Sequence, residues 1–204
     1  MTSDAVKLLF LKLKIEYLES NRYLPESLGR SDVTRTFYYR RNRREFDQLT
    51  TRYAWALKCG EGLPLLEVRN LGGPLGYGLF TLSPLKPGDL IGEYTGIVRR
   101  AHPGRPLSGG GYTSDYSWGF PKVRTFSREL EIDAREAGGL LRFANHVSEA
   151  GSETDSGPSA EPDHFPVDRQ WHVVFTARLP IEAGGEITVD YGEAYWNQSE
   201  RELV

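Results

Sequence analysis

Cysteine is almost absent from this chain of 204 residues, with Cys59 as its single example. A lone cysteine excludes a disulfide within one chain and a zinc site built from several cysteines. Long apolar runs are also lacking, since none reaches the ~18 residues that a membrane-spanning helix needs. The first residues do not have a signal-peptide layout, because Lys7, Lys12 and Glu16 interrupt their apolar positions. We therefore expect a cytoplasmic protein with no metal site. Secretion into a host cell or entry into a nucleus cannot be recognised from cysteine content, apolar runs or the first residues.

Positive charge is scarce in most of the chain and concentrated near its start. The formal net charge is −3, but residues 1–60 hold 12 Lys/Arg against 7 Asp/Glu and the remainder holds 13 against 21. A basic cluster follows Tyr38 and Tyr39 and consists of Arg40, Arg41, Arg43 and Arg44. This cluster is either a solvated helix face or a contact for nucleic acid or an acidic partner. The acidic remainder would attract a lysine-rich basic protein.

Apolar periodicity divides the chain into a helical prefix and a strand-rich remainder. Residues 4–19 and 42–58 have apolar stripes at helical spacing, and we assign both to an N-terminal segment over 1–62. The stripes must be buried, either on the domain that follows or against a second copy of the chain in a homodimer.

Short strands alternate with turns after residue 64. Residues 134–146 are expected to begin as a helix, and the polar stretch 147–163 is expected to be a mobile loop. Strands are expected at 65–70, 78–83, 89–100, 115–121, 129–133, 170–179 and 186–192.

Four short motifs follow one another in the strand-rich part. They are Gly76-Tyr77-Gly78, IGEYTG at 91–96, LLRFANH at 140–146 and TVDYGEAYW at 188–196. This ordered set resembles the SET-domain protein lysine methyltransferases over about Pro64 to Trp196. The resemblance implies a SET catalytic domain over 63–197 and a C-terminal tail over 198–204. It implies a mainly β (β-rich α+β) fold of small β-sheets with a pseudoknot-like C-terminal threading.

The resemblance also implies an enzyme that transfers a methyl group from S-adenosyl-L-methionine to lysine. Such a transfer is an in-line displacement in which the lysine attacks as a neutral amine, although its reference pKa is ~10.4. A narrow, desolvated channel lowers that pKa. Catalysis then consists mostly of aligning two reactants, without a metal.

Individual residues take their expected roles from the same resemblance. Tyr191 and Tyr116 would be catalytic, and Val189 and Phe165 would line the substrate channel. Neither channel residue carries a hydroxyl group, which predicts di- or trimethylation unless Tyr112 or Tyr116 enters the channel. The cofactor would be bound by Gly76, Tyr77, Gly78, Asn145, His146 and Trp196.

Within the family, the chain resembles the cysteine-poor chlamydial and bacterial SET-domain histone methyltransferase type. The shared features are IGEYTGIVRR, the basic helical prefix and the aromatic pair Tyr195-Trp196. The implied substrate is a histone or histone-like protein. Two alternatives remain open: a non-catalytic SET-like module that binds a protein partner, and a nucleic-acid-associated protein.

Overall fold

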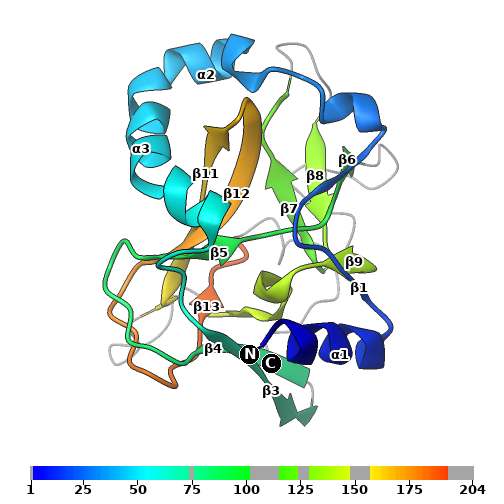
Figure 1. Ribbon diagram of the computed structural model, residues 1–204, viewed down its shortest axis with the longest axis vertical. Helices are drawn as coiled ribbons and strands as arrows, with labels where there is room; N and C mark the ends of the chain where they lie inside the picture. Colours follow the sequence, from blue (N-terminus) through cyan, green and yellow to red (C-terminus); the bar gives the residue numbers. More distant parts are fainter. Residues whose placement is uncertain (1, 74–75, 102–114, 124–128, 148–156, 193–204) are drawn as a thin grey trace.

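The computed structural model describes residues 2–73, 76–101, 115–123, 129–147 and 157–192 (Figure 1). Most of its helical residues lie in the first 60 positions, and small sheets make up the remainder. The helices are α1 (Ser3–Leu13), α2 (Phe37–Arg41) and α3 (Arg43–Cys59), with the 3-10 helices η1 (Glu26–Leu28), η2 (Val33–Arg35) and η4 (Leu140–Phe143). This mainly β architecture confirms the expected fold class. Among the described residues, no helix is long and apolar enough to cross a membrane.

The strands pair into several small sheets instead of one large one. Their bounds are β1 (Glu16–Tyr17), β2 (Arg22–Leu24), β3 (Leu66–Gly72), β4 (Gly76–Thr81), β5 (Leu90–Glu93), β6 (Ile97–Arg100), β7 (Ser117–Phe120), β8 (Leu130–Asp133), β9 (Ala137–Gly138), β10 (Asn145–His146), β11 (Ala160–Val167), β12 (Gln170–Ala177) and β13 (Thr188–Val189). The larger sheets have the orders β2–β6–β8–β7 and β11–β12–β5, and the pairs are β3–β4, β1–β9 and β10–β13.

The N-terminal segment is built into the strand-rich remainder. Its short strands β1 and β2 pair in parallel with β9 and β6. Val6 and Phe10 of α1 and Phe46 of α3 join the hydrophobic cluster formed by the later strands. Burying a side chain of this size is worth roughly 1.5–3 kcal/mol. Most of the apolar stripe therefore packs on this chain, while Leu8 and Leu11 of α1 stay exposed.

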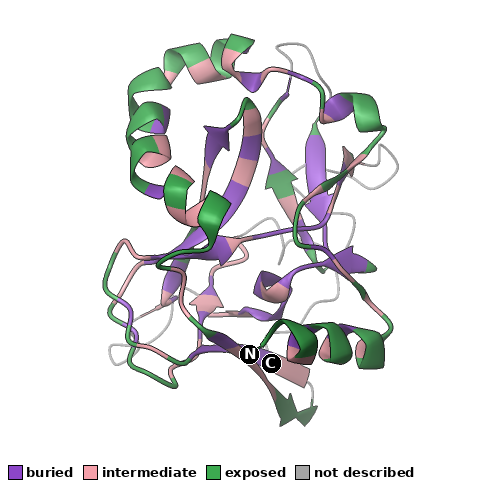
Figure 2. Cartoon of the chain, in the orientation of Figure 1, coloured by how far each residue is buried: buried purple, intermediate pink, exposed green. Residues whose placement is uncertain are grey.

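Helix α3 lies against β11 (Figure 1). The hydroxyl of Thr50 donates a hydrogen bond to the carbonyl oxygen of Pro166 at 2.9 Å. The ring centroid of Tyr53 lies 5.8 Å from that of Phe165, and the Tyr53 hydroxyl donates to the carbonyl oxygen of Gly88 at 2.7 Å. One face of α3 is thereby fixed to the sheet, and Figure 2 shows that the opposite face is exposed.

The first helix is shorter than its periodicity predicts. α1 ends at Leu13, because Lys14 adopts the left-handed conformation (φ 58°) and its N–H caps the carbonyls of Leu11 and Phe10. Glu16 then pairs with Ala137 in a parallel bridge. The expectation of a helix to residue 19 was wrong because long-range strand pairing satisfies the backbone beyond Lys14.

Three other expectations need correction. The stretch 134–146 contains β9 and the 3-10 helix η4 in place of an α-helix, and the strand expected at 186–192 is limited to Thr188–Val189. Of the polar stretch 147–163, residues 148–156 lie outside the described part, but 160–163 belong to β11 and pair with β12. The apolar strand 170–177 supplies a complete partner for this polar sequence, and that pairing overrides its loop-like composition.

Candidate active site

Two segments far apart in the sequence meet where β10 and β13 pair. Asn145 lies beside Thr188, and His146 lies beside Val189. After β13, the backbone N–H of Tyr191 donates to His146 Nδ1 at 3.1 Å. The Asn-His and Asp-Tyr motifs are therefore one structural unit, as their resemblance to a single site implies.

The turn that follows β13 directs Tyr191 inward. Gly192 adopts φ 79°, a conformation that favours glycine, and its N–H donates to Asp190 Oδ1 at 2.7 Å. The hydroxyl of Tyr191 donates to the carbonyl oxygen of Ala144 at 2.8 Å. Asp190 therefore serves as a turn-stabilising hydrogen-bond acceptor, and its neighbour Tyr191 is held against the residue before the Asn-His pair.

Tyr191 lines a narrow cavity together with residues from four other parts of the chain. The cavity volume is about 10 Å³, which is roughly the space for the centre of one water molecule. Its lining residues are Tyr94, Asp115, Tyr116, Ser117, Trp118, Leu141, Arg142, Ala144, Phe175, Val189 and Tyr191. The structure thus brings together three of the residues expected at the reaction centre: Tyr191, Tyr116 and Val189.

Tyr116 forms the outer wall of this cavity. Its side chain is 36% exposed, and the guanidinium of Arg142 lies 4.1 Å from its ring centroid. Arg142 is itself buried, where its Nε donates to the carbonyl oxygen of Ala134 at 2.9 Å, and burial lowers its pKa. Among the aromatic rings that line the cavity, Tyr116 is the most exposed.

Tyr94 also lines the cavity, and sequence reasoning missed it. Its hydroxyl donates to the carbonyl oxygen of Tyr116 at 2.8 Å. Burial raises the pKa of Tyr94 well above its ordinary value, and nearby Tyr191 adds to that effect. Tyr94 therefore remains a hydrogen-bond donor at neutral pH. A signal was present in the motif IGEYTG, where this tyrosine follows the buried strand β5.

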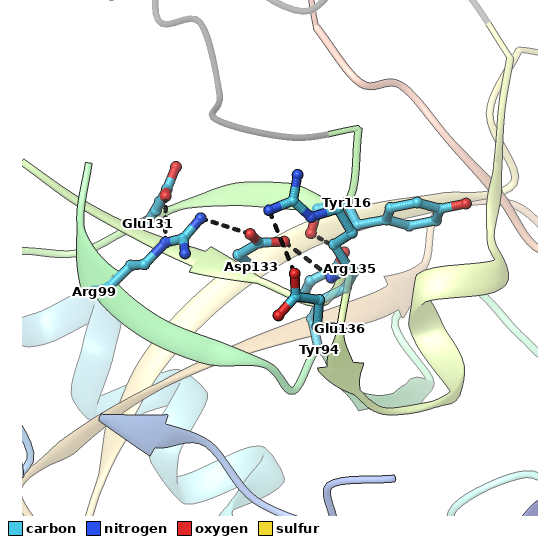
Figure 3. A network of polar contacts seen from close by, with 7 residues as sticks. All are labelled: Tyr94, Arg99, Tyr116, Glu131, Asp133, Arg135 and Glu136. Carbon is cyan, nitrogen blue, oxygen red and sulfur yellow. Dashed lines mark hydrogen bonds and ion pairs between the residues drawn. The ribbon is translucent and has the colours of Figure 1, made fainter. Parts of the chain in front are cut away.

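An ion-pair network with two buried carboxylates supports strand β7, which begins directly after Tyr116 (Figure 3). Arg99 on β6 contacts Glu131 at 2.9 Å and Asp133 at 2.7 Å, and both carboxylates are on β8. β8 pairs with β7, where Ser117 lies beside Asp133. The N–H of Ala134 donates to the Tyr116 carbonyl at 2.9 Å. The backbone of Tyr116 is thus anchored on two sides while its ring remains partly exposed.

The glycine motif begins strand β4 of the antiparallel β3–β4 pair, and its backbone packs closely against Glu186. Gly76 adopts φ 62°, and a Cβ atom on Gly78 would lie 2.7 Å from Glu186 Oε1. That same carboxylate oxygen accepts a hydrogen bond from Asn145 Nδ2 at 2.9 Å. The ring centroid of Tyr77 lies 5.9 Å from that of Phe143, the residue two positions before Asn145. The glycine turn and Asn145 therefore meet at Glu186, which sequence reasoning did not select.

His146 is held as a neutral ring. Burial lowers its pKa, although the nearby carboxylate of Asp190, with Oδ1 at 3.6 Å from Nδ1, opposes that shift. Because Nδ1 accepts the N–H of Tyr191, it carries no proton in this arrangement. His146 thus fixes the backbone of Tyr191 through a hydrogen bond that protonation would remove.

One expected site residue, Phe165, does not line this cavity. Its side chain is fully buried with Tyr53, Leu90 and Val174. The register of β11 turns Phe165 toward α3, so the substrate-channel assignment of this residue was wrong. Trp196 lies outside the described residues. In the described ranges, no group of three His, Cys, Asp or Glu side chains could hold a metal ion.

The comparison with protein families identifies the domain. Residues 76–192, more than half of the chain, match the family model described as SET domain. The chain belongs to the SET-domain family. All the site residues that we predicted within the described part of the chain, from Gly76 to Tyr191, fall inside this range.

Known relatives agree with this assignment. Histone-lysine N-methyltransferase EZH2 of Chaetomium thermophilum is 26% identical over 133 residues, which are 62% of this chain and 8% of that protein. ATXR5 in complex with histone H3.1 has a TM-score of 0.65 at 17% identity, covering 94% of this chain and 87% of that chain. The ATXR5 SET domain in complex with histone H3 has a TM-score of 0.66 at 17% identity, with coverages of 95% and 88%. At such low identity the two structures show the shared SET fold alone.

Proposed function

We propose that this protein is an S-adenosyl-L-methionine-dependent lysine methyltransferase that acts on a basic protein such as a histone or histone-like protein. The observation that carries this proposal is the convergence of Tyr191, Tyr116 and Val189 on one narrow cavity. SET-family membership and the likeness to a histone-lysine N-methyltransferase support the same activity at the family level.

The residues beside the cavity fit a cationic methyl donor. When bound, S-adenosyl-L-methionine supplies a methyl group on a positively charged sulfur. The resemblance implies that the backbone at Gly76 and Gly78 approaches it closely, and the Glu186 carboxylate beside Asn145 would provide complementary negative charge. We assign its binding to Gly76, Tyr77, Gly78, Asn145 and His146. The adenine-covering role of Trp196 stays a prediction.

The cavity walls suit a lysine that must lose its proton before it attacks. Trp118, Phe175 and Val189 supply apolar surface that lowers the pKa of a lysine amine by desolvation. Asp115, an exposed carboxylate at the cavity, attracts the ammonium form on arrival. The hydroxyl of Tyr191 and the backbone carbonyl of Ala144 lie where they can align the amine with the methyl group.

Transfer of labelled methyl groups tests this function directly. The purified chain would be incubated with labelled S-adenosyl-L-methionine and a panel of histones, bacterial histone-like proteins and the enzyme itself. We expect label on lysine of at least one basic protein. If the cofactor binds but no member of the panel is labelled, the non-catalytic SET-like binding module becomes the better description. The chlamydial and bacterial subtype also stays a proposal, supported by the low cysteine content.

The homodimer is a further prediction that rests on α1. Leu8 and Leu11 are 67% and 73% exposed, so part of the apolar stripe of this helix is uncovered in the single chain. Light scattering would compare the wild type with Leu8→Glu/Leu11→Glu, and Lys7→Glu/Lys12→Glu on the same helix serves as the charge-changing control. A monomeric mass for the wild type would reject the dimer.

A further inference from the structure

An open groove on the outer face of α2 and α3 is lined mainly by arginine. It has a volume of about 850 Å³ and lies away from the cavity of Tyr191, with which it shares no lining residue. The groove residues are Arg40, Arg41, Arg43, Arg44, Asp47, Gln48, Thr51 and Arg52. All of them are exposed (Figure 2). Five cations therefore face solvent in a molecule whose formal net charge is −3.

The one carboxylate in this groove is already engaged. Asp47 accepts a hydrogen bond from the Tyr39 hydroxyl at 2.6 Å and forms an ion pair with Arg43 at 3.2 Å. In the described residues, no ion pair is formed by Arg40, Arg41 or Arg44 within 4.0 Å. The described part of the chain therefore places no carboxylate in ion-pair distance of these three arginines.

The groove is held in place by the packing beneath it. Arg52 donates to the carbonyl oxygen of Gly88 at 2.9 Å, and Thr50 and Tyr53 fasten the inner face of α3 to the sheet region. On α3, Arg43 and Arg52 lie nine residues apart, which is about 14 Å along the helix axis at ~1.5 Å per residue. The arginines are thus presented on an ordered helical surface, and binding there needs no folding of a disordered segment.

We propose that this groove binds the phosphate backbone of duplex DNA. All five cations are arginines, whose planar guanidinium groups bind phosphate through two parallel hydrogen bonds. Regularly spaced phosphates, one charge per ~1.7 Å of duplex, can engage several of these cations at once. The side-chain amide of Gln48 adds a neutral donor of the kind that contacts phosphate oxygens.

The charge distribution of the chain favours DNA over an acidic protein as the partner, and this step rests on the proposed function. A histone-like substrate is basic and is found on DNA, so its complex presents both positive and negative surfaces. The acidic remainder of the chain suits the positive protein, and the arginine groove suits the DNA that carries it. The groove would then hold the enzyme on the same duplex as its substrate.

Fluorescence anisotropy with a labelled 20-base-pair duplex of random sequence tests this inference on the full chain. Binding should weaken steeply as salt rises, with a slope of log K against log[salt] of about −0.9 per phosphate contacted. The triple variant Arg40→Gln/Arg41→Gln/Arg44→Gln loses three phosphate contacts, so its slope should be less negative than that of the wild type by about 2.7. Its binding should weaken to a similar extent on duplexes of different sequence.

The control removes equal charge elsewhere through Lys7→Gln/Lys12→Gln/Lys86→Gln, all at exposed positions, and it should bind DNA nearly as the wild type does. Circular dichroism confirms that each variant is folded. No DNA binding by the wild type, an unchanged salt slope in the arginine variant, or equally tight binding of polyglutamate would overturn the proposal. The last result would indicate an acidic protein partner.

Methylation of a short free lysine peptide separates this inference from the proposed function. The arginine variant should methylate the peptide as well as the wild type does, because the groove shares no residue with the cavity. Salt-dependent DNA binding in a chain that methylates nothing would reject the enzyme and retain the groove. Methylation without DNA binding would reject the DNA-binding groove and retain the enzyme.

Discussion

The hydroxyl of Tyr191 donates a hydrogen bond to the carbonyl oxygen of Ala144 at 2.8 Å, although 47 residues separate the two in sequence. This contact joins the two motifs that carry the SET resemblance. It also places Tyr191 at a cavity whose other walls come from Tyr94 after β5, from β7 and the two residues before it, from η4 and from β12. The proposed reaction centre is thus produced by tertiary packing of short elements.

The first prediction is that Tyr191→Phe loses most methyl transfer and keeps cofactor binding. The change removes one hydroxyl and leaves the ring in place, so we expect turnover to fall about tenfold or more, each tenfold being ~1.4 kcal/mol of barrier. The unpaired, buried Ala144 carbonyl should cost about 1–3 kcal/mol of stability. Tyr39→Phe, which removes a hydroxyl bonded to Asp47 on α3, is the matched control. Turnover equal to that of the control would remove Tyr191 from catalysis.

The second prediction concerns Asn145, whose amide donates to Glu186 at 2.9 Å beside the glycine turn. Asn145→Ala should weaken S-adenosyl-L-methionine binding by about 1–3 kcal/mol, since the change leaves buried polar groups without a partner. Calorimetric titration measures this loss, with the exposed Gln48→Ala as control. An unchanged affinity in Asn145→Ala would show that the cofactor does not depend on this amide.

These two residues show how far sequence reasoning reaches. Tyr191 and Asn145 each belong to a contiguous motif that sequence reasoning could select, and the parallel pairing of β10 with β13 brings the two motifs together. Tyr94 was missed because a tyrosine after a buried strand is usually a core residue, and its role depends on a hydroxyl that reaches the distant carbonyl of Tyr116. Phe165 was misplaced because the side of the sheet on which its side chain lies depends on the register of β11 with β12. Composition does not encode that register.

The third prediction is a loss of stability in mild acid. Burial lowers the pKa values of His146 and His164 from the ordinary value near 6.5. The unfolded chain therefore takes up protons at a higher pH than the folded protein, so the stabilisation is complete above ~6.5 and is lost as pH falls below it. His164 accepts or donates one hydrogen bond with the Tyr38 hydroxyl at 2.8 Å, and protonation leaves only the donor role.

Thermal midpoints measured between about pH 8 and pH 5.5 would check this, because most carboxylates titrate lower, near ~4. The thermal midpoint of the wild type should fall as the pH is lowered from about 8 to about 5.5. His164→Gln, which cannot titrate, should show a shallower fall even if its midpoint is lower throughout. A midpoint that rises on acidification, or an identical slope in both proteins, would contradict the assignment.

The fourth prediction is the product state, which depends on the hydroxyl groups around the cavity. Val189 alone predicts di- or trimethylation, because valine holds no water in the space that a further methyl needs. Tyr116 changes that expectation, since its side chain lines the same cavity and Tyr94 fixes its carbonyl. Tyr112 lies outside the described residues. With Tyr94 and Tyr116 beside Tyr191 in a cavity of about 10 Å³, we expect the wild type to stop at monomethyl-lysine.

Removing the hydroxyl of the more exposed tyrosine should release this limit. Tyr116→Phe frees the space of one oxygen and of the water it holds, so di- and trimethyl-lysine should accumulate even where the first transfer slows. Mass spectrometry at long reaction times gives the product distribution, with Tyr39→Phe as the control and fresh substrate added to show that the enzyme is still active. Accumulation of dimethyl-lysine by the wild type would mean that Val189, and not Tyr116, sets the product. An unchanged monomethyl limit in Tyr116→Phe would instead assign that limit to Tyr94, whose hydroxyl remains in the cavity wall.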